Sequence, residues 1–488
     1  MASSQGERYS QQHLYCWDPI LDSRQKLSDD YDEPFVEAFS AGDLDSDFIT
    51  SFMQAFDEND ACNYATKRVV DFCKGADLAG LRQNMSATTE LVALLDDGIG
   101  STALNLYETL VKMKEDSKRK GPDATRRYIP SLTPWTVVAL AASAPTYQAS
   151  ILGEFMFNHL RFDPLINAYI QRDNITSFTF EFQLPYFSLR EQRMPQEDTR
   201  GLRRYEDITF LRNMGNKLDN SPTKYIYESK VSHLISGTSR YSWSGFLIND
   251  RYFETDGEAE TIEEYLVQGS EGIMPDPFAA KKRLMGDLPN DAREHFLIVL
   301  GTYLKHVNKE SSNVFMAVDE SIQSYKKNYW YQKICKASHR SNHHKGCPDS
   351  DTNRVRIREE HQEWMRRSVE LLRKLSGILN QYRDEWKMFS DHGLNYFLST
   401  DDASHLKKLR KSLVAVDQQV IGLERLRNKF KNIIDSYEDM SRNFNDRIAL
   451  EDNESAFSQK RTARDVKLLT WITFVKQLSP KSYYGIRN

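Results

Sequence analysis

The chain has 488 residues, 40% of them hydrophobic and 28% charged, which is enough for two or three domains with a substantial core. Its net charge of −5 and isoelectric point near 6.2 argue against a general nucleic-acid-binding protein. The N-terminus lacks the basic and apolar parts of a secretory signal, and no stretch reaches about 18 consecutive apolar residues. We therefore expect neither secretion nor a membrane-spanning helix. The sparse cysteines favour a reducing compartment with free thiols; they are Cys16, Cys62, Cys73, Cys335 and Cys347.

Residues 1–60 are polar and acidic. Between residues 18 and 60 there are thirteen acidic residues and two basic ones. A segment of this composition buries too little apolar surface to offset the entropy of folding. We expect residues 1–60 to form an acidic, disordered N-terminus.

Residues 61–335 have the pattern of a soluble α/β domain. Apolar residues at three- and four-residue spacing predict helices near residues 90–95 and 104–113, and a more apolar helix near 135–142. Asp96-Asp97-Gly98 could hold a hard cation, but adjacent carboxylates point in different directions. We interpret these residues as a helix C-terminus capped by Gly98.

The apolar period changes from helical to strand-like near residue 178. Residues 178–184 (FTFEFQL) alternate apolar and polar side chains, which predicts a half-buried strand, and Pro185 marks its end or a sheet edge. Strands are also expected at 225–234 and 243–250, with a long loop over 191–222. Residues 262–306 return to a helical pattern with a break at Asp276-Pro277. Helices around several strands predict an α+β (α/β) domain with a mixed sheet flanked by helices.

A polar linker is expected over residues 336–353. It carries a group of soft and imidazole side chains, Cys335, His339, His343 and Cys347, with His344 beside them. These residue types can hold zinc in a small loop, but their spacing fits no standard zinc site. A solvated, basic linker is the interpretation we favour.

Residues 354–475 are predicted to form long antiparallel or stalk helices joined near residues 399–404. Over residues 406–448, apolar side chains recur in alternating steps of three and four, and ten of thirteen such positions are Leu, Ile, Val or Phe. At about 1.5 Å per residue this helix would extend some 60 Å. It suits a stalk or an oligomer seam; the alternative is a helical hairpin that packs on its own domain.

Chemical motifs are absent from the rest of the sequence. There is no phosphate-binding P-loop, Rossmann glycine fingerprint, HExxH, GxSxG or EF-hand loop. We therefore expect a non-enzymatic protein and assign no catalytic, cofactor-binding or metal-binding residues. Over the last 29 residues, seven basic residues accompany one acid, Asp465. Basic residues beside an apolar segment suit contact with an anionic membrane surface, although an ordinary frayed tail has the same composition.

The heptad helix is followed by residues 463–475 (ARDVKLLTWITFV), and this junction resembles the CorA-like magnesium transporter superfamily, particularly its divergent fungal branch. Residues 178–190, 225–237 and 243–253 also resemble the fungal members. The resemblance implies an α/β domain followed by long stalk helices, assembly through the stalk, and magnesium or another divalent cation as the transported and regulatory ion.

The chain departs from this family after Val475. The family continues with a membrane helix that ends in Gly-Met-Asn, whereas residues 476–488 (KQLSPKSYYGIRN) form a basic tail in its place. Charges there would cost about 2.5–3.5 kcal/mol each at a bilayer centre. The expected function is that of the cytosolic domain and stalk of a CorA-like relative, with no pore of its own. An intact family member would be membrane-associated, whereas we expect this chain to be cytoplasmic. The alternative is a soluble protein that oligomerises or binds partners through its coiled helices, without nucleic acid in either case.

Overall fold

The structure is a computed structural model of the chain, and it forms two compact units. The first unit comprises residues 1–348 and 373–430, and the second comprises residues 349–372 and 431–488. Each unit is described by itself. The described residues are 16–25, 33–38, 48–54, 63–83, 91–97, 101–105, 108–109, 124–172, 175–211, 223–254, 262, 265, 274–325, 349–400 and 402–478.

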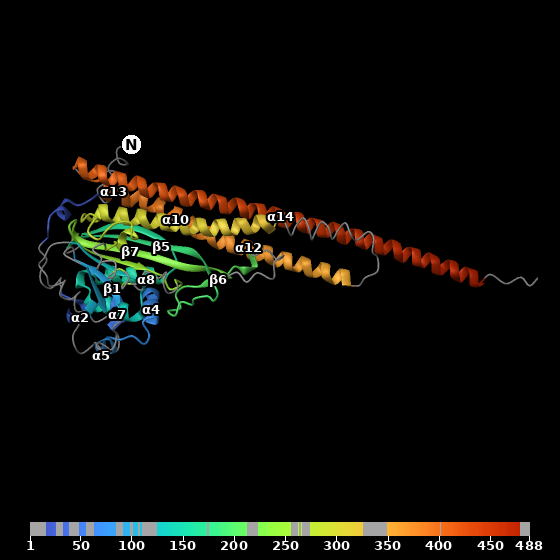
Figure 1. Ribbon diagram of the computed structural model, residues 1–488, viewed down its shortest axis with the longest axis horizontal. Coiled ribbons are helices and arrows are strands. Elements are labelled where there is room, and N and C mark those ends of the chain that lie inside the picture. Colours follow the sequence, from blue (N-terminus) through green and yellow to red (C-terminus); the bar gives the residue numbers. More distant parts are fainter. Residues whose placement is uncertain are drawn as a thin grey trace, which may run out of the picture. The chain divides into compact units, whose positions relative to one another are not determined.

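The described part of the first unit is built on an eight-stranded mixed sheet (Figure 1). Its order is β2-β1-β3-β8-β7-β5-β4, with β6 paired to β7. The β3–β8 pair is parallel and the other pairs are antiparallel. The strands are β1 (Leu91–Asp96), β2 (Ser101–Asn105), β3 (Thr125–Ile129), β4 (Leu165–Arg172), β5 (Thr176–Gln192), β6 (Tyr205–Asp207), β7 (Thr223–Ser239) and β8 (Ser242–Asn249).

The two faces of the sheet differ in chemistry because side chains alternate along β5. Phe178, Phe180 and Phe182 form an aromatic face and are fully buried. The ring of Phe180 lies 4.8 Å from that of Phe397 and 5.5 Å from that of Phe296. The opposite, polar face carries Thr179, Glu181 and Gln183 from β5. The alternation that predicts this strand therefore separates two different environments.

Helices α7 (Pro134–Ser143) and α8 (Ala149–Leu160) cover the polar face (Figure 1). Pro134 occupies the first turn of α7, and the hydroxyl of Thr133 accepts a hydrogen bond from the backbone N–H of Thr136. Both helices are almost wholly buried, and they share one apolar core with α2 (Phe35–Ala38), α3 (Phe48–Gln54), α4 (Asn63–Phe72) and α5 (Leu78–Gln83).

Parts of the acidic N-terminus contribute side chains to the core of the first unit. Phe52 and Met53 of α3 are fully buried, and the Trp17 ring lies 5.4 Å from that of Phe178. Most of the described large apolar side chains before residue 60 are buried, whereas Ile20 is 46% exposed, and the disorder of residues 1–60 as a whole stays a prediction. Composition averages hide such clustering.

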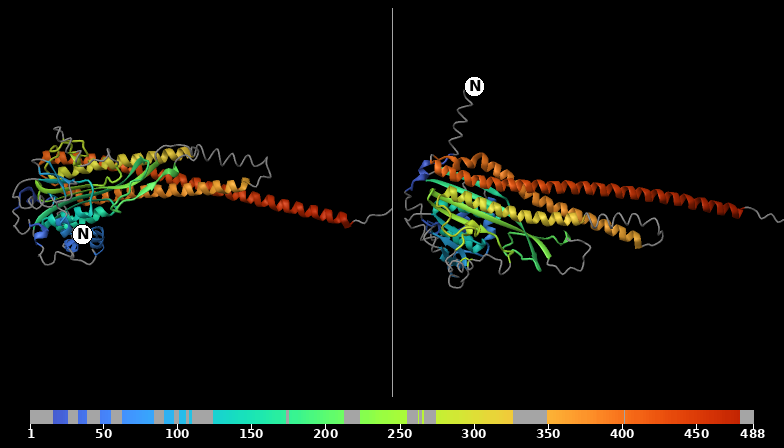
Figure 2. Two further views of the ribbon diagram at one scale, coloured as in Figure 1. Left: turned by 60° about the horizontal axis from the view of Figure 1, so that its bottom comes forward. Right: turned by 45° about the horizontal axis from the view of Figure 1, so that its top comes forward.

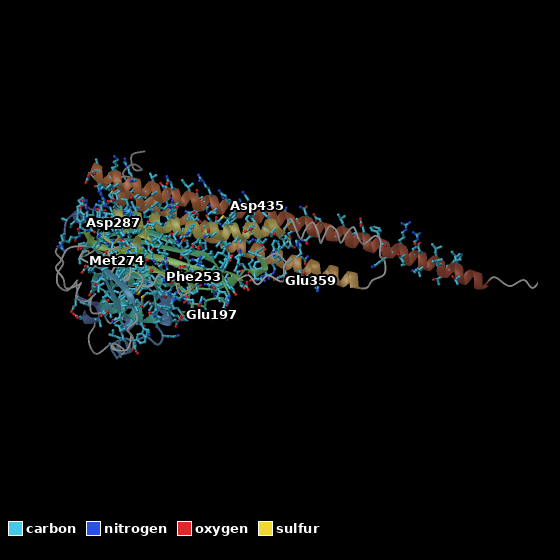
Figure 3. All side chains as sticks on the ribbon, in the orientation of Figure 1. Glu197, Phe253, Met274, Asp287, Glu359 and Asp435 are labelled. Carbon is cyan, nitrogen blue, oxygen red and sulfur yellow. The ribbon has the colours of Figure 1, made fainter. Side chains whose placement is uncertain are left out.

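The aromatic face is covered by helices that come from the second half of the chain. They are α10 (Ala292–Tyr325), the end of α12 (Asp349–Met388), α13 (Leu394–Leu398) and the start of α14 (Ala403–Leu478). A π-helical turn, Phe389–Gly393, joins α12 to α13. In Figure 2 the helices coloured yellow to orange run along one face of the green strands, and Figure 3 shows side chains in the space between them.

The second unit contains the first part of α12 and the later part of α14. Within it the rings of Trp364 and Tyr437 stack at 5.6 Å, and both side chains are buried. From residue 442 on, every described side chain of α14 whose exposure is defined is exposed. The sequence therefore produces a single helix of 76 residues with two different halves.

The predicted fold class is confirmed: a mixed sheet flanked by helices precedes long C-terminal helices. Residues 178–184, 225–234 and 243–249 lie in strands as expected, and 135–142 lies in α7. The helix predicted at 90–95 is wrong, and over the described residues 274–306 the predicted helix is found only from Ala292 on. Residues 91–96 form β1 instead. The strand at 178–184 also continues through Pro185 to Gln192 instead of ending there.

Candidate functional site

The inner part of α14 packs against its own domain. Its seam residues Leu409, Val416, Leu423 and Phe430 are buried. The ring of Phe430 lies 5.1 Å from that of Phe315 on α10. Such burial matches the hairpin alternative for this stretch, since these side chains are already used within the first unit.

The distal part of α14 has the opposite character. Its apolar side chains are exposed by about half or more, from Ile472 at 46% to Phe457 at 74%. Those exposed are Leu450, Phe457, Val466, Leu468, Leu469, Trp471 and Ile472. At 100° per residue, Leu450, Phe457, Leu468 and Trp471 fall within about 60° of one another around the helix. We call these four residues the distal stripe.

Basic side chains precede the apolar end of the helix. Lys460, Arg461, Arg464 and Lys467 are all exposed, and they are followed directly by Leu468 and Leu469. Among the described residues, no helix has an apolar stretch long enough to cross a bilayer. The distal end of α14 thus presents positive charge and then apolar surface.

A buried charge network lies at the polar face of the sheet. Asp250, at the end of β8, receives hydrogen bonds from Arg203 Nε at 2.7 Å and Arg200 Nη1 at 2.8 Å. Both guanidinium groups lie in the segment between β5 and β6, and Asp198 also binds Arg200 at 2.7 Å. The two adjacent positive charges hold the pKa of Asp250 well below its ordinary value, against the opposing effect of burial.

Ser232, His159 and Asp250 lie in the order of a hydrolytic triad. The Ser232 hydroxyl lies 2.7 Å from His159 Nδ1, and His159 Nε2 lies 3.5 Å from an Asp250 oxygen. All three side chains are fully buried, and burial lowers the pKa of His159 to about 4. Ser232 donates its proton to Gln183, so its hydroxyl is not directed at a substrate. The arrangement is a packing network rather than an acyl-transfer site.

Glu181 is a second buried acid on the polar face. Its Oε1 accepts hydrogen bonds from Gln183 at 2.7 Å and Asn158 at 3.2 Å. Burial raises its pKa to about 7, with the nearby Glu154 adding to the effect. Lys230 is also fully buried, and its ammonium group donates to the backbone carbonyls of residues 158, 161 and 163 at 2.5, 2.8 and 3.2 Å.

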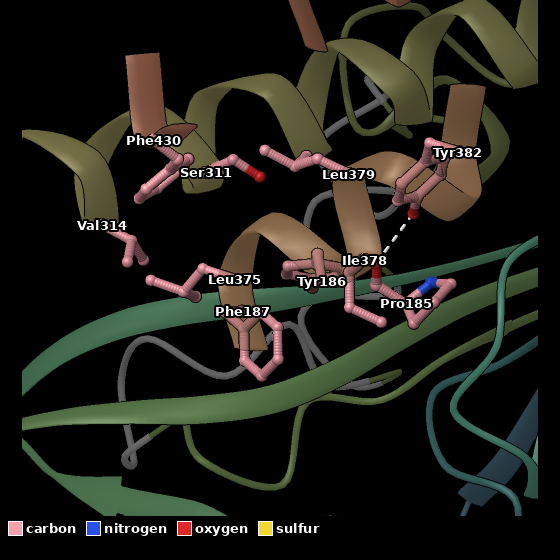
Figure 4. A pocket seen from close by; sticks show the side chains of 10 residues that line it. All are labelled: Pro185, Tyr186, Phe187, Ser311, Val314, Leu375, Ile378, Leu379, Tyr382 and Phe430. Carbon is pink, nitrogen blue, oxygen red and sulfur yellow. Dashed lines mark hydrogen bonds between the residues drawn. The ribbon is translucent and has the colours of Figure 1, made fainter. Parts of the chain in front are cut away.

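An open polar pocket of about 340 Å³ adjoins this region. It is lined by Asn158, Arg161, Asp163, Pro164, Leu165, Gln183, Gln381 and Glu385. A second, apolar pocket lies between β5 and helices α10, α12 and α14 (Figure 4). Its free volume is about 10 Å³, which is room for one water molecule and not for an organic ligand.

Two groups of residues have side chains of the types that bind metal ions. Asp96 ends strand β1, so the prediction that it ends a helix is wrong; Gly98 lies outside the described residues. The carboxylates of Asp96 and Asp276 both bind Arg126, whose guanidinium occupies the position that a cation would take. Cys335, His339, His343, His344 and Cys347 also lie outside the described residues. Within the described ranges no three His, Cys, Asp or Glu side chains come together to hold a metal, so no magnesium site is assigned to them.

The comparisons with known proteins give little. No family model matches the chain, and no curated protein matches it. Among solved structures, the chain is similar to the full-length CmaX protein with 13% identity and a TM-score of 0.34, over 83% of this chain and 89% of that one. This TM-score is too low to assign a common fold.

Proposed function

We propose that the protein is the cytosolic domain and stalk of a CorA-like divalent-cation transporter relative, and that it acts as a non-enzymatic assembly module. The exposed distal stripe of α14 carries this proposal. Burial of these four large apolar side chains against a partner would stabilise a complex, by roughly 1.5–3 kcal/mol for each side chain that is fully buried. The resemblance at residues 463–475 supports the transporter relation.

Assembly in this proposal uses the distal part of α14 and not its inner seam. Leu423 is 2% exposed and is covered within its own unit, so a charge there would damage the domain itself. The polar seam positions Glu451, Ser458, Thr462 and Asp465 also interrupt the heptad register beyond residue 448. A second copy that covers the distal stripe is the partner that the exposed residues suit.

The assembly role is tested by the mass of the purified chain in light scattering. Phe457→Asp plus Leu468→Asp places two charges in the stripe, eleven residues apart. Gln459→Asp plus Thr470→Asp places two charges at the same spacing on the opposite side of the helix, where both residues are exposed. We expect a multimer for the natural chain and the control, and a monomer for the stripe variant. A natural chain that remains a monomer would contradict the proposal.

The proposed contact between the basic part of α14 and a membrane surface is tested separately, by vesicle binding. Basic side chains near an anionic surface contribute about 1 kcal/mol each to binding. Arg461→Glu plus Arg464→Glu should reduce flotation with phosphatidylserine vesicles, and Lys407→Glu plus Lys408→Glu, an equal charge change at the other end of α14, should not. Assembly without any vesicle binding would favour the alternative of a soluble interaction protein.

A further inference from the structure

The polar pocket of about 340 Å³ is formed by residues of the first unit, whereas the residues of the distal stripe belong to the second. Three segments form it: the C-terminal turn of α8, the turn that leads into β4, and one side of α12. Gln183 of β5 lies among the lining residues and is fully buried. A volume above about 300 Å³ is sufficient for a small organic molecule.

The rim of this pocket is held in place by Lys230. Its ammonium group donates to the carbonyl oxygens of Asn158, Arg161 and Asp163, which matches its three N–H donors. The carbonyl of Asn158 belongs to the last turn of α8, where carbonyl groups lack helical partners. A buried side chain therefore ties the end of α8 to the turn that lines the pocket, so the pocket is preorganised.

Acceptors outnumber free donors around this space. Glu385 accepts a hydrogen bond from the backbone N–H of Ile166, and no side-chain cation pairs with it among the described residues. Burial raises the pKa of Glu385, and the negative charges of Asp384 and Asp163 add to the effect. The guanidinium of Arg161 is occupied by Asp163 at 2.6 Å. The electrostatic balance therefore favours a ligand that brings positive charge and N–H groups.

Glu181 adds a buried acceptor behind the pocket wall. It is 2% exposed, and both donors to its Oε1, Asn158 and Gln183, line the pocket. Its Oε2 accepts no hydrogen bond from the described residues. Asn158 donates a hydrogen bond from its amide nitrogen to Glu181, and its amide oxygen remains an acceptor. The amide oxygen of Asn158 therefore gains from a donor placed in the pocket, and the negative charge of Glu181 behind it favours a cation.

We propose that this pocket binds a small organic cation, of the alkylammonium or alkyldiamine class, between the carboxylate of Glu385 and the amide oxygen of Asn158. An anion is disfavoured because the one guanidinium in the lining is already paired. An apolar ligand is disfavoured because amides and carboxylates dominate the lining. A bound ammonium group would donate to several oxygens, and charge-assisted hydrogen bonds of this kind are about twice as strong as neutral ones.

The test is a ligand-observed NMR titration of the full chain with 1,4-diaminobutane, with 1,4-butanediol as the neutral probe of the same length. Salt is matched between the two series. We expect saturable binding of the diamine and none of the diol. Glu385→Gln, which keeps the shape and removes the charge, should weaken the diamine at least about tenfold, which corresponds to about 1.4 kcal/mol.

Asp384→Asn is the matched control. Asp384 is adjacent in sequence, its side chain is 62% exposed, it pairs with Arg383, and it does not line the pocket. It changes the net charge by the same amount as Glu385→Gln and should weaken diamine binding much less, because its exposed carboxylate acts on the pocket only through a solvent-screened charge. Three results would each overturn the proposal: no saturable binding of the diamine, equal binding of the diol, or an equal loss in both variants. Circular dichroism confirms that each variant is folded.

Discussion

Arg203 donates its Nε proton to Oδ2 of Asp250 at 2.7 Å, and neither side chain has any solvent exposure. Asp250→Asn removes the carboxylate that neutralises Arg203 and leaves that cation buried without a charged partner, while Arg200 keeps its bond to Asp198. Breaking a buried pair in this way costs about 3–5 kcal/mol. Urea unfolding followed by circular dichroism should show that loss.

The exposed pair of Glu191 and Lys224, at 3.0 Å, serves as the reference for this prediction. Glu191→Gln should change the unfolding free energy by less than about 1 kcal/mol, because water screens an exposed pair. Equal effects of the two substitutions would show that the interior around Asp250 is hydrated.

Glu181 should make the stability of the first unit depend on pH. Its folded pKa of about 7 lies above the ordinary value of 4.5, so the unfolded chain releases this proton first. Stability should therefore fall as pH rises from about 4.5 to about 7. Glu181→Gln lacks the titrating proton and should be the more stable form at neutral pH, by roughly 1–3 kcal/mol. Thermal melts across this range measure both slopes, and parallel curves would refute the assignment.

Tyr382 on α12 donates its phenolic proton to the carbonyl of Pro185 at 2.8 Å (Figure 4). Tyr382→Phe leaves that carbonyl without a partner in a buried site, which costs about 1–3 kcal/mol. Tyr64 is 67% exposed, so Tyr64→Phe should cost almost nothing. Denaturation midpoints of the two variants provide the comparison, and a neutral Tyr382→Phe would mean that a water replaces the hydroxyl.

Two glycines should respond in opposite directions to alanine. A Cβ at Gly237 in β7 would lie 2.5 Å from the carbonyl of Ser242 and 2.6 Å from the Cβ of Trp243, so Gly237→Ala should destabilise the β7–β8 hairpin. A Cβ at Gly377 inside α12 meets nothing within 4 Å. Gly377→Ala should raise stability by about 0.5–1 kcal/mol through helix propensity. Melting temperatures that move in the same direction for both would contradict this reading.

Much of the fold is visible in local pattern, and the errors have physical causes. The alternating segment at 178–184 predicts β5 because only one of its faces is aromatic. The run at 91–96 (LVALLD) is apolar on both faces, so no period distinguishes a buried strand from a helix. Pro185 does not end β5 because its pairing position needs no N–H. The carbonyl of its partner Lys230 binds the N–H of Asp250 on the far side, so this is a pair without ladder bonds between β5 and β7.

The buried networks could not be predicted from spacing. His159, Arg203, Ser232 and Asp250 come from four separate segments, and only the sheet brings them together. A polar residue directly after the apolar strand at 243–249 is a weak signal for Asp250. The distal end of α14 was the easier feature, since basic residues followed by apolar ones are adjacent in the chain.

The position of α14 also bears on how the protein is made. The aromatic face of β5 is complete once residue 192 has been synthesised, yet its cover includes Phe296 and Phe397. The α10 helix in turn packs against Phe430. On a ribosome that adds about 5–20 residues per second, this face waits roughly 10–40 s for its last cover. During translation, then, the nascent chain exposes a phenylalanine-rich strand, and general chaperones have a defined segment to hold.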